Sequence, residues 1–162
     1  MTTAVSNDLD LRDIEQFVYR EARLADVADY DAWEALWTDD AIYWVPADGE
    51  PDPSTHVSVI YDNRSRIATR LAQLRTGKRY AQVPQSRVAR VISNVEIIGT
   101  NGPNTVVGAT FVLAEARNGV QEWWAGRIEY QVRAEEGQLR LAGKKVVVVN
   151  NDDALPTLTF LI

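Results

Sequence analysis

The first strongly patterned stretch of the chain has apolar residues at helical spacing. Apolar side chains recur there every three or four positions, at Leu11, Ile14, Val18, Ala22, Ala25 and Ala28. Charged side chains fall mainly on the opposite side of a helix with this pattern. Asn7 or Asp8 is placed to cap it, because a short polar side chain accepts a hydrogen bond from a free backbone amide. The pattern predicts an amphipathic helix that ends near Asp26, after a flexible lead-in over residues 1–7.

Shorter elements are predicted between this helix and residue 77. Asp31 and Glu34 have the spacing of a capping box, which favours a second helix. Pro46 and the glycine and prolines after it are typical of a loop. In chain order we expect a helix over 32–36 that residues 38–40 break, a strand over 41–45 and a loop over 46–55. After these we expect a short strand or extended arm over 56–61 and a helix from Asp62 to a left-handed stop at Gly77.

The second half of the chain alternates apolar and polar residues with a period of two, which is typical of strands. One alternating face reads Val107, Ala109, Phe111 and Leu113; another reads Trp124, Gly126, Ile128, Tyr130 and Val132. Turn residues separate the strands at 101–104, 118–119 and 135–137. In the final strand, over 138–150, the alternation changes phase, which predicts a bulge at Gly143.

Helices followed by a long antiparallel meander predict an α+β fold. The expected strands exceed the usual five or six residues, and long strands twist and curl. We therefore expect a curved sheet wrapped around the first helix as a cone, with residues 1–162 forming a single domain.

Composition excludes several functions. The chain has 17 basic and 23 acidic residues, a net charge of −6, and no basic run that would bind nucleic acid. It has no cysteine and one histidine, so thiolate metal sites and disulfides are excluded. No apolar run approaches the roughly 20 residues of a membrane helix, and the start of the chain lacks signal-peptide features. We expect a soluble, cytoplasmic protein with no membrane partner.

One group of side chains suggests acid–base catalysis. A carboxylate beside a tyrosine can transfer a proton at a carbon next to a carbonyl. The alternative is that the two aspartates end a helix and the tyrosine fills the core. The candidates for a catalytic role are Asp26, Asp39, Asp40, Tyr43 and His56.

A second group suggests a protein interface. The predicted strand after Ser86 carries several polar residues, with Arg90, Asn94 and Glu96 expected on one face. Such groups are costly to bury unless they are paired, so they are either solvated or matched by a partner. Trp123 and Trp124 point to opposite faces of their strand, so one of them is available to a partner. The predicted interface residues are Arg87, Arg90, Asn94, Glu96 and Trp123.

Several sequence segments resemble the small (beta) subunit of bacterial aromatic-ring-hydroxylating dioxygenases, within the NTF2-like/SnoaL-like superfamily. The matching segments are Glu21-Ala22-x-Leu24-x-Asp26, WTDDAIYWVP over 37–46, Tyr61-Asp62, R-x3-LRTG-x-x-YAQ-x-P-x-SR followed by SNV over 70–95, Gly126-Arg127, and LTFLI over 158–162. The resemblance covers essentially the whole chain after residue 8. In one departure, Arg90 stands where family members often have histidine.

The resemblance implies a non-catalytic, structural chain with no cofactor of its own. In such enzymes the large (alpha) subunit holds a Rieske [2Fe–2S] cluster and a mononuclear Fe(II). It adds oxygen-derived hydroxyl groups to an aromatic substrate. The expected assembly is a three-plus-three hetero-hexamer with the small subunits self-associated as a trimer. One histidine and no cysteine fit this division, because neither iron site can be ligated within the chain.

Two alternatives remain open at this point. A stand-alone lyase or isomerase would need an open interior pocket in which a carboxylate and a tyrosine converge. A carrier or transport factor would need an exposed apolar groove.

Overall fold

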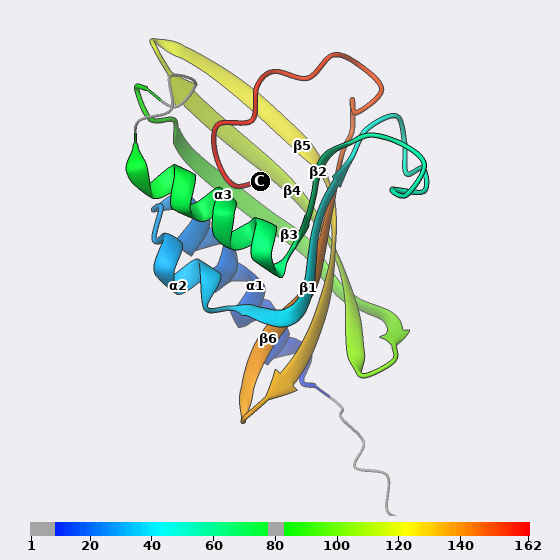
Figure 1. The fold of residues 1–162 in the computed structure, drawn as a ribbon. Helices are drawn as coiled ribbons and strands as arrows, with labels where there is room; N and C mark the ends of the chain where they lie inside the picture. The colour runs from blue at the N-terminus through cyan, green and yellow to red at the C-terminus, as the bar shows by residue number, and fades with distance from the viewer. Residues whose placement is uncertain (1–8, 78–82) are drawn as a thin grey trace, which may run out of the picture.

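The computed structural model describes residues 9–77 and 83–162. The predicted lead-in over 1–7, the possible caps Asn7 and Asp8, and the Tyr80-Ala81-Gln82 part of the family motif lie outside these residues. In chain order the elements are α1 (Leu11–Asp26), α2 (Tyr30–Glu34), β1 (Trp37–Pro46), β2 (Ser58–Asn63), α3 (Arg64–Thr76), β3 (Arg87–Asn101), β4 (Asn104–Arg117), β5 (Val120–Glu135) and β6 (Gln138–Val148) (Figure 1). No helix among the described residues is long and apolar enough to cross a membrane.

The six strands form one sheet in the order β2-β1-β6-β5-β4-β3. The meander predicted for β3 to β6 is confirmed, because each strand pairs antiparallel with the next. One pairing lies outside this meander, since β1 pairs parallel with β6. This pairing joins segments about a hundred residues apart, and local patterning does not reveal such contacts. The α+β fold with a curved sheet is confirmed.

The helix ends follow local chemistry, but the N-terminal cap of each of the three helices differs from the predicted one. Asp10 caps α1 by accepting a hydrogen bond from the Arg12 amide, and α1 ends at Asp26 as predicted. The second helix lies two residues earlier than predicted and is capped by Asp29. Asn63, rather than Asp62, caps α3, and Gly77 ends it in the left-handed conformation as predicted.

Residues 38–40 were predicted to interrupt regular structure after the second helix. They are instead part of β1, which corrects the prediction for these polar residues. Thr38 is buried and donates a hydrogen bond to Asp40 Oδ1 at 2.7 Å. Because this bond gives the buried Thr38 hydroxyl a partner, the polar residues 38–40 can be part of strand β1.

The alternating faces of β4 and β5 point into the core as predicted. The bulge predicted in β6 is present: Gln131 pairs with Gly143 and Val132 with Leu141, which leaves Ala142 as the extra residue. After the bulge Lys144, and not Lys145, points inward.

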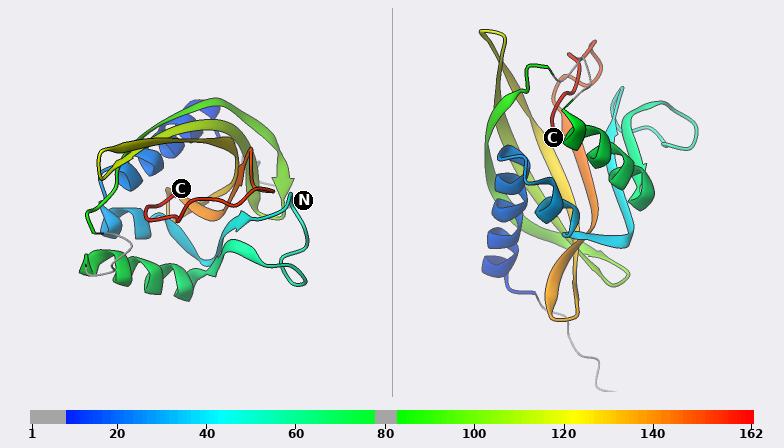
Figure 2. Two further views of the ribbon diagram at one scale, coloured as in Figure 1. Left: turned by 90° about the horizontal axis from the view of Figure 1, so that it is seen from above. Right: turned by 60° about the vertical axis from the view of Figure 1, so that its left-hand side comes forward.

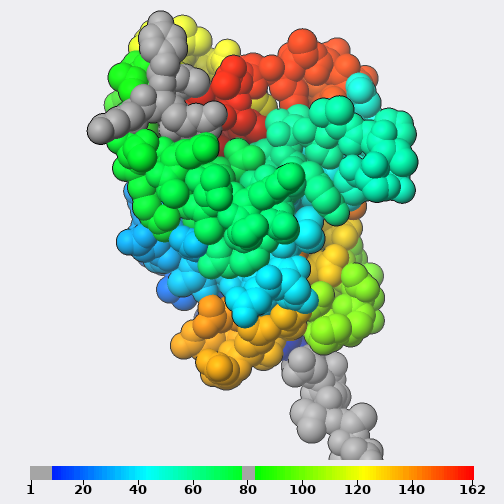
Figure 3. Space-filling view, viewed as in Figure 1, coloured from blue at the N-terminus to red at the C-terminus, as the bar shows by residue number. Residues whose placement is uncertain are grey.

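The core lies between the inner face of the curved sheet and the helices. The segment after β6 returns into this curve, as the view from above shows (Figure 2). Its last two residues, Leu161 and Ile162, are 2% and 1% exposed. On the face seen in Figure 3, α3, the segment between β1 and β2, and this final segment cover the interior.

Candidate functional site

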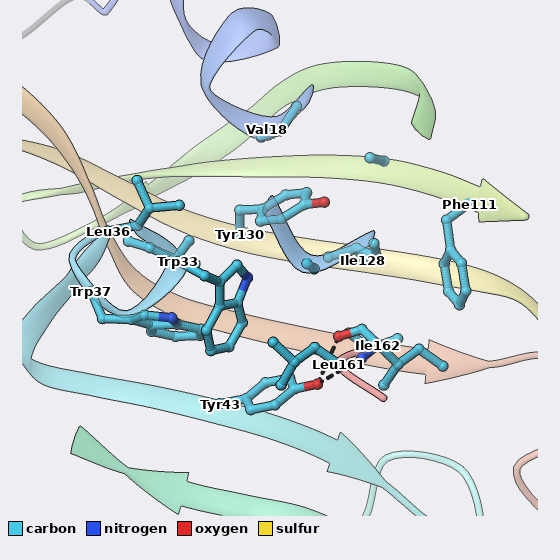
Figure 4. Close-up of a cluster of buried hydrophobic side chains, with 14 of the residues drawn as sticks. Val18, Trp33, Leu36, Trp37, Tyr43, Phe111, Ile128, Tyr130, Leu161 and Ile162 are labelled. Atoms are coloured by element: carbon cyan, nitrogen blue, oxygen red, sulfur yellow. Dashed lines mark hydrogen bonds between the residues drawn. The ribbon is translucent and has the colours of Figure 1, made fainter. Parts of the chain in front are cut away.

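The interior of the cone is filled by large side chains (Figure 4). The rings of Trp33 and Trp37 meet edge to face with centroids 5.1 Å apart, and Trp33 and Tyr43 do so at 5.9 Å. Leu161 and Ile162 fill the space beside Tyr43. The aromatic rings and the final segment occupy the position that an interior binding pocket would need.

A buried ion pair lies within this core. The Lys144 Nζ donates to Glu21 Oε1 at 2.7 Å, and the Trp33 indole donates to the same oxygen at 2.9 Å. Both charged side chains are essentially inaccessible. Burial lowers the pKa of Lys144, and the neighbouring Glu21 carboxylate acts in the opposite direction. The pair connects α1 to β6 across the centre of the fold.

Tyr43, a predicted catalytic residue, is bound to the final segment. Its hydroxyl donates to the Ile162 carbonyl oxygen at 2.7 Å and accepts from the Ile162 amide at 3.1 Å. Burial raises the pKa of Tyr43 well above its usual value, so the hydroxyl stays protonated at neutral pH. The hydroxyl proton is used by the Ile162 carbonyl, and Tyr43 is fully buried, so it does not face a substrate pocket.

Asp26 forms an ion pair with Arg90, which links two of the predicted site residues. The Arg90 Nε donates to Asp26 Oδ1 at 2.7 Å, and the Arg90 backbone amide donates to Asp26 Oδ2 at 3.1 Å. The Arg90 guanidinium also donates to the Leu161 carbonyl oxygen at 2.5 Å. The Arg90 side chain is 1% exposed, so its bonds lie within its own chain.

The remaining acid–base candidates lie at the surface. Asp39 is exposed, and the His56 ring lies in an exposed loop, where its Nδ1 is 2.8 Å from the Thr55 hydroxyl. The Arg133 guanidinium donates to Asp40 at 2.8 Å and, with the Thr38 hydroxyl, lowers the pKa of Asp40 to about 2. The structure therefore does not bring the five candidates together around one pocket.

The predicted interface residues occupy two different faces of the sheet. We expected Arg90, Asn94 and Glu96 on one face, and this is wrong. Asn94 has a φ of 55° and lies in a bulge of β3 between the pairs Ser93–Thr110 and Glu96–Gly108. The bulge reverses the alternation, so Arg90 points inward while Glu96 is exposed. Arg87 and Trp123 are exposed on the outer face.

An open groove of about 640 Å³ lies on this outer face. Asn94 and Glu96 line one side of it, and Arg127 and Lys145 line the other. Lys145 is held by Glu50, at 2.8 Å, from the segment between β1 and β2. The groove is open, and its lining mixes charged side chains with apolar ones such as Val95 and Ile98.

Sequence patterns missed two buried polar groups. One is the Glu21–Lys144 pair, whose signal was a glutamate on the apolar stripe of α1 together with the phase change in β6. The other is Glu115, which accepts hydrogen bonds from the Ser86 hydroxyl at 2.6 Å, Thr159 at 3.2 Å and the Trp124 indole at 3.3 Å. This second group ties the start of β3 and the final segment to β4, and no local pattern indicates it.

Neither iron centre implied by the resemblance has a ligand set here. Within residues 9–77 and 83–162, no three histidine, cysteine, aspartate or glutamate side chains lie together in a group able to hold a metal ion. The chain's one histidine is exposed and bonded to a threonine. We derive no catalytic step through a metal bound by this chain.

A family model described as "Ring hydroxylating beta subunit" matches residues 20–152. Over 136 residues the chain is 31% identical to the small oxygenase component of the p-cumate 2,3-dioxygenase system of Pseudomonas putida. This alignment covers 82% of this chain and 76% of the relative. The chain is 29% identical to the 2-halobenzoate 1,2-dioxygenase small subunit of Burkholderia cepacia, over 93% of each chain.

Solved structures give the same comparison. The beta subunit of benzoate 1,2-dioxygenase from Burkholderia mallei matches with a TM-score of 0.75 and 30% identity, covering 88% of this chain and 93% of that one. An NTF2-like protein with a cystatin-like fold from Novosphingobium aromaticivorans matches with a TM-score of 0.58 and 16% identity, covering 87% and 82%. The second likeness concerns the fold alone, and it confirms the predicted fold class.

Proposed function

Because this chain belongs to the ring hydroxylating beta subunit family, we propose that it is the structural small subunit of a dioxygenase that hydroxylates an aromatic ring. The observation that carries the proposal is the filled interior. The position of a pocket is taken by aromatic side chains and by Leu161 and Ile162. The five acid–base candidates are dispersed, which disfavours the stand-alone lyase or isomerase.

We place the oxidation chemistry in a partner. The relatives are named as small components of dioxygenases for p-cumate, 2-halobenzoate and benzoate. For this assembly we propose an aromatic substrate bound in a large subunit, with a Rieske [2Fe–2S] cluster and a mononuclear Fe(II) in that subunit. The chain would then contribute to an oxidoreductase without a catalytic residue of its own.

For the assembly we propose three small and three large subunits, with the small subunits self-associated as a trimer. The outer face of the sheet supplies the contacts we favour, because Arg87, Asn94, Glu96 and Trp123 are exposed there. Arg90 has a different role, since its guanidinium is bound to Asp26 and Leu161. The single domain and the cytoplasmic location expected from the sequence stay predictions.

Co-expression with candidate Rieske-type large subunits tests the proposal. A tag on the large subunit should retain this chain, and light scattering after size exclusion should give a mass near three copies of each. Oxidation of an aromatic substrate should require the large subunit and persist in an Asp39→Asn variant of this chain. Failure of every large subunit to retain the chain contradicts the proposal, as does turnover of a substrate by this chain alone.

A further inference from the structure

An exposed linker joins the sheet to the end of the final segment. β6 ends at Val148, and residues 152–157 are exposed except for the half-buried Leu155. Among the described residues, none of residues 154–162 takes part in a backbone–backbone hydrogen bond. The position of the last five residues, 158–162, therefore depends on side-chain contacts. We call these five residues the strap.

Side chains of the sheet bind the backbone of the strap. The Tyr43 hydroxyl donates to the carbonyl oxygen of Ile162 and accepts from the amide of the same residue. The Arg90 guanidinium donates to the carbonyl oxygen of Leu161. Within a sheet, by contrast, backbone groups pair with the backbone of a neighbouring strand. The strap is therefore held in the way that a receptor holds a separate peptide.

One side chain of the strap has polar partners of its own. The Thr159 hydroxyl lies 2.6 Å from the Ser86 hydroxyl and donates to Glu115 Oε1 at 3.2 Å. Thr159 is buried, whereas Thr157, two residues earlier, is exposed. A buried hydroxyl has lost its hydration and needs partners, so Ser86 and Glu115 fix which residue of the strap lies at this point.

Apolar contacts complete the site. The Phe160 ring meets the Trp124 ring edge to face, with the two centroids 5.6 Å apart. Leu161 and Ile162 are buried in the core. A mostly apolar lining with a few fixed polar groups is typical of a ligand-binding site. Here the strap of the same chain occupies that site.

We propose that the interior of the cone is a binding site for an extended apolar peptide, occupied in the intact chain by its own residues 158–162. The strap is then a tethered ligand, and the sheet and helices keep their structure when it leaves. The peptides that fit have a hydroxyl-bearing residue followed by one aromatic and two aliphatic residues. This inference does not depend on the proposed function, because no large subunit takes part in it.

Cleavage of the linker tests whether the strap is separable. A protease recognition sequence inserted between Asp153 and Ala154 lies outside every contact of the strap, and it is cut in the folded protein. The cleaved protein should keep the circular dichroism spectrum of the uncut chain. The released end, residues 154–162, should stay bound at high protein concentration and leave on dilution. Size exclusion followed by mass spectrometry measures both states.

A labelled peptide measures the recognition. The probe is fluorescein-labelled ALPTLTFLI, the sequence of residues 154–162, and fluorescence anisotropy reports its uptake by the cleaved protein. Thr159→Ala in the peptide should weaken binding about tenfold, because the bonds of this hydroxyl to Ser86 and Glu115 are lost. Thr157→Ala is the matched control and should bind like the parent peptide, since Thr157 is exposed.

Two further controls separate recognition from general adhesion. The same peptide with its last five residues reversed (ILFTL) has the same composition and should bind much more weakly, because its side chains no longer match the fixed polar groups. The uncut chain should not take up the parent peptide at about 10 μM, because a short tether gives its own strap a millimolar effective concentration.

The proposal is overturned if cleavage unfolds the chain, because the strap is then part of the fold and not a ligand of it. It is also overturned if the folded, cleaved protein does not exchange its released end for the peptide. Equal binding of the parent peptide and either the reversed or the Thr159→Ala peptide contradicts it, as does uptake by the uncut chain. Failure to bind a large subunit would remove the proposed function and leave these results unaffected.

Discussion

At the scale of single residues, the centre of the fold depends on one charged side chain. Lys144 reaches the core because the bulge at Ala142 changes which residues of β6 point inward. Its charge is balanced by Glu21 Oε1, while Glu21 Oε2 has no hydrogen-bond partner among the described groups. A buried ion pair seldom adds net stability, but removing one partner leaves an uncompensated charge.

Lys144→Met should therefore lower the free energy of unfolding by about 3–5 kcal/mol, measured by urea denaturation. The E21Q/K144M double variant should lose less, because the glutamine is neutral and its side-chain oxygen still accepts from Trp33. Equal losses in the single and double variants would show that the cost comes from packing and not from the unpaired carboxylate.

Asp40 predicts a small pH dependence of stability. Its pKa falls from 3.8 to about 2 in the folded chain, with hydrogen bonds from Arg133 and Thr38 as the main causes. A lowered pKa stabilises the fold above about pH 4, and this contribution is lost as the pH falls toward 2. Asp40 is 68% exposed, so solvent screening keeps the effect below about 1 kcal/mol.

The measurement is the difference in unfolding free energy between wild type and Asp40→Asn at several pH values. This difference should be constant from pH 7 to 5 and shrink between pH 4 and 2. A difference that does not change with pH would mean that the ion pair with Arg133 has no stabilising effect in solution.

At the scale of elements, β3 is an edge strand whose free side is partly covered. The Arg90 amide points away from β4 and donates to Asp26, the last residue of α1. The same carboxylate binds the Arg90 side chain. An unpaired strand edge invites pairing with another chain, and the end of α1 blocks the edge of β3 at this point.

Asp26→Asn should lower the free energy of unfolding by about 2 kcal/mol, because it removes a charged partner from a buried arginine. Hydrogen exchange at the Arg90 amide should become faster. Asp39→Asn is the control: Asp39 is exposed, so its replacement should change stability by less than about 0.5 kcal/mol. Unchanged exchange at Arg90 would argue against protection of the edge by Asp26.

At the scale of the whole molecule, the final segment determines whether the cone is open or closed. Arg90 binds Leu161, and Tyr43 binds Ile162. The two residues lie on β3 and β1, toward opposite edges of the sheet. Thr159 is held by Glu115 on β4. Contacts from three strands thus fix one short segment inside the curve.

Tyr43→Phe should lower the free energy of unfolding by about 1–3 kcal/mol, because the buried amide and carbonyl of Ile162 lose their partner. In this variant the amides of the final segment should exchange faster than in the wild type, while those of β5 should change less. Tyr130→Phe is a matched control, since the Tyr130 hydroxyl is buried without a partner among the described residues. Equal destabilisation of the two variants would mean that the Tyr43 hydroxyl does not hold the segment.

Much of the fold is readable from local patterns. The stripe of α1, the stop at Gly77 and the inward faces of β4 and β5 follow from spacing and turn chemistry. The start of the second helix differs for a local reason, because Asp29 caps it two residues earlier than expected. Distant residues decide what local patterns leave open, as with the parallel pairing of β1 with β6. The candidate site follows the same rule: Asp26, Tyr43 and Arg90 are important residues, but their partners are distant in sequence.

The sequence by itself determined the fold class and the family motifs, because periodicity and turn residues act over a few positions. It also determined that the chain lacks the cysteine and histidine ligands of an iron centre, because those are counts. Only the tertiary structure decided that the interior is filled, that Lys144 points inward, and that Arg90 and Glu96 face opposite ways. Each of these outcomes depends on a bulge or on contact between residues far apart in the chain, where a shift of one position exchanges the inside of a strand with its outside.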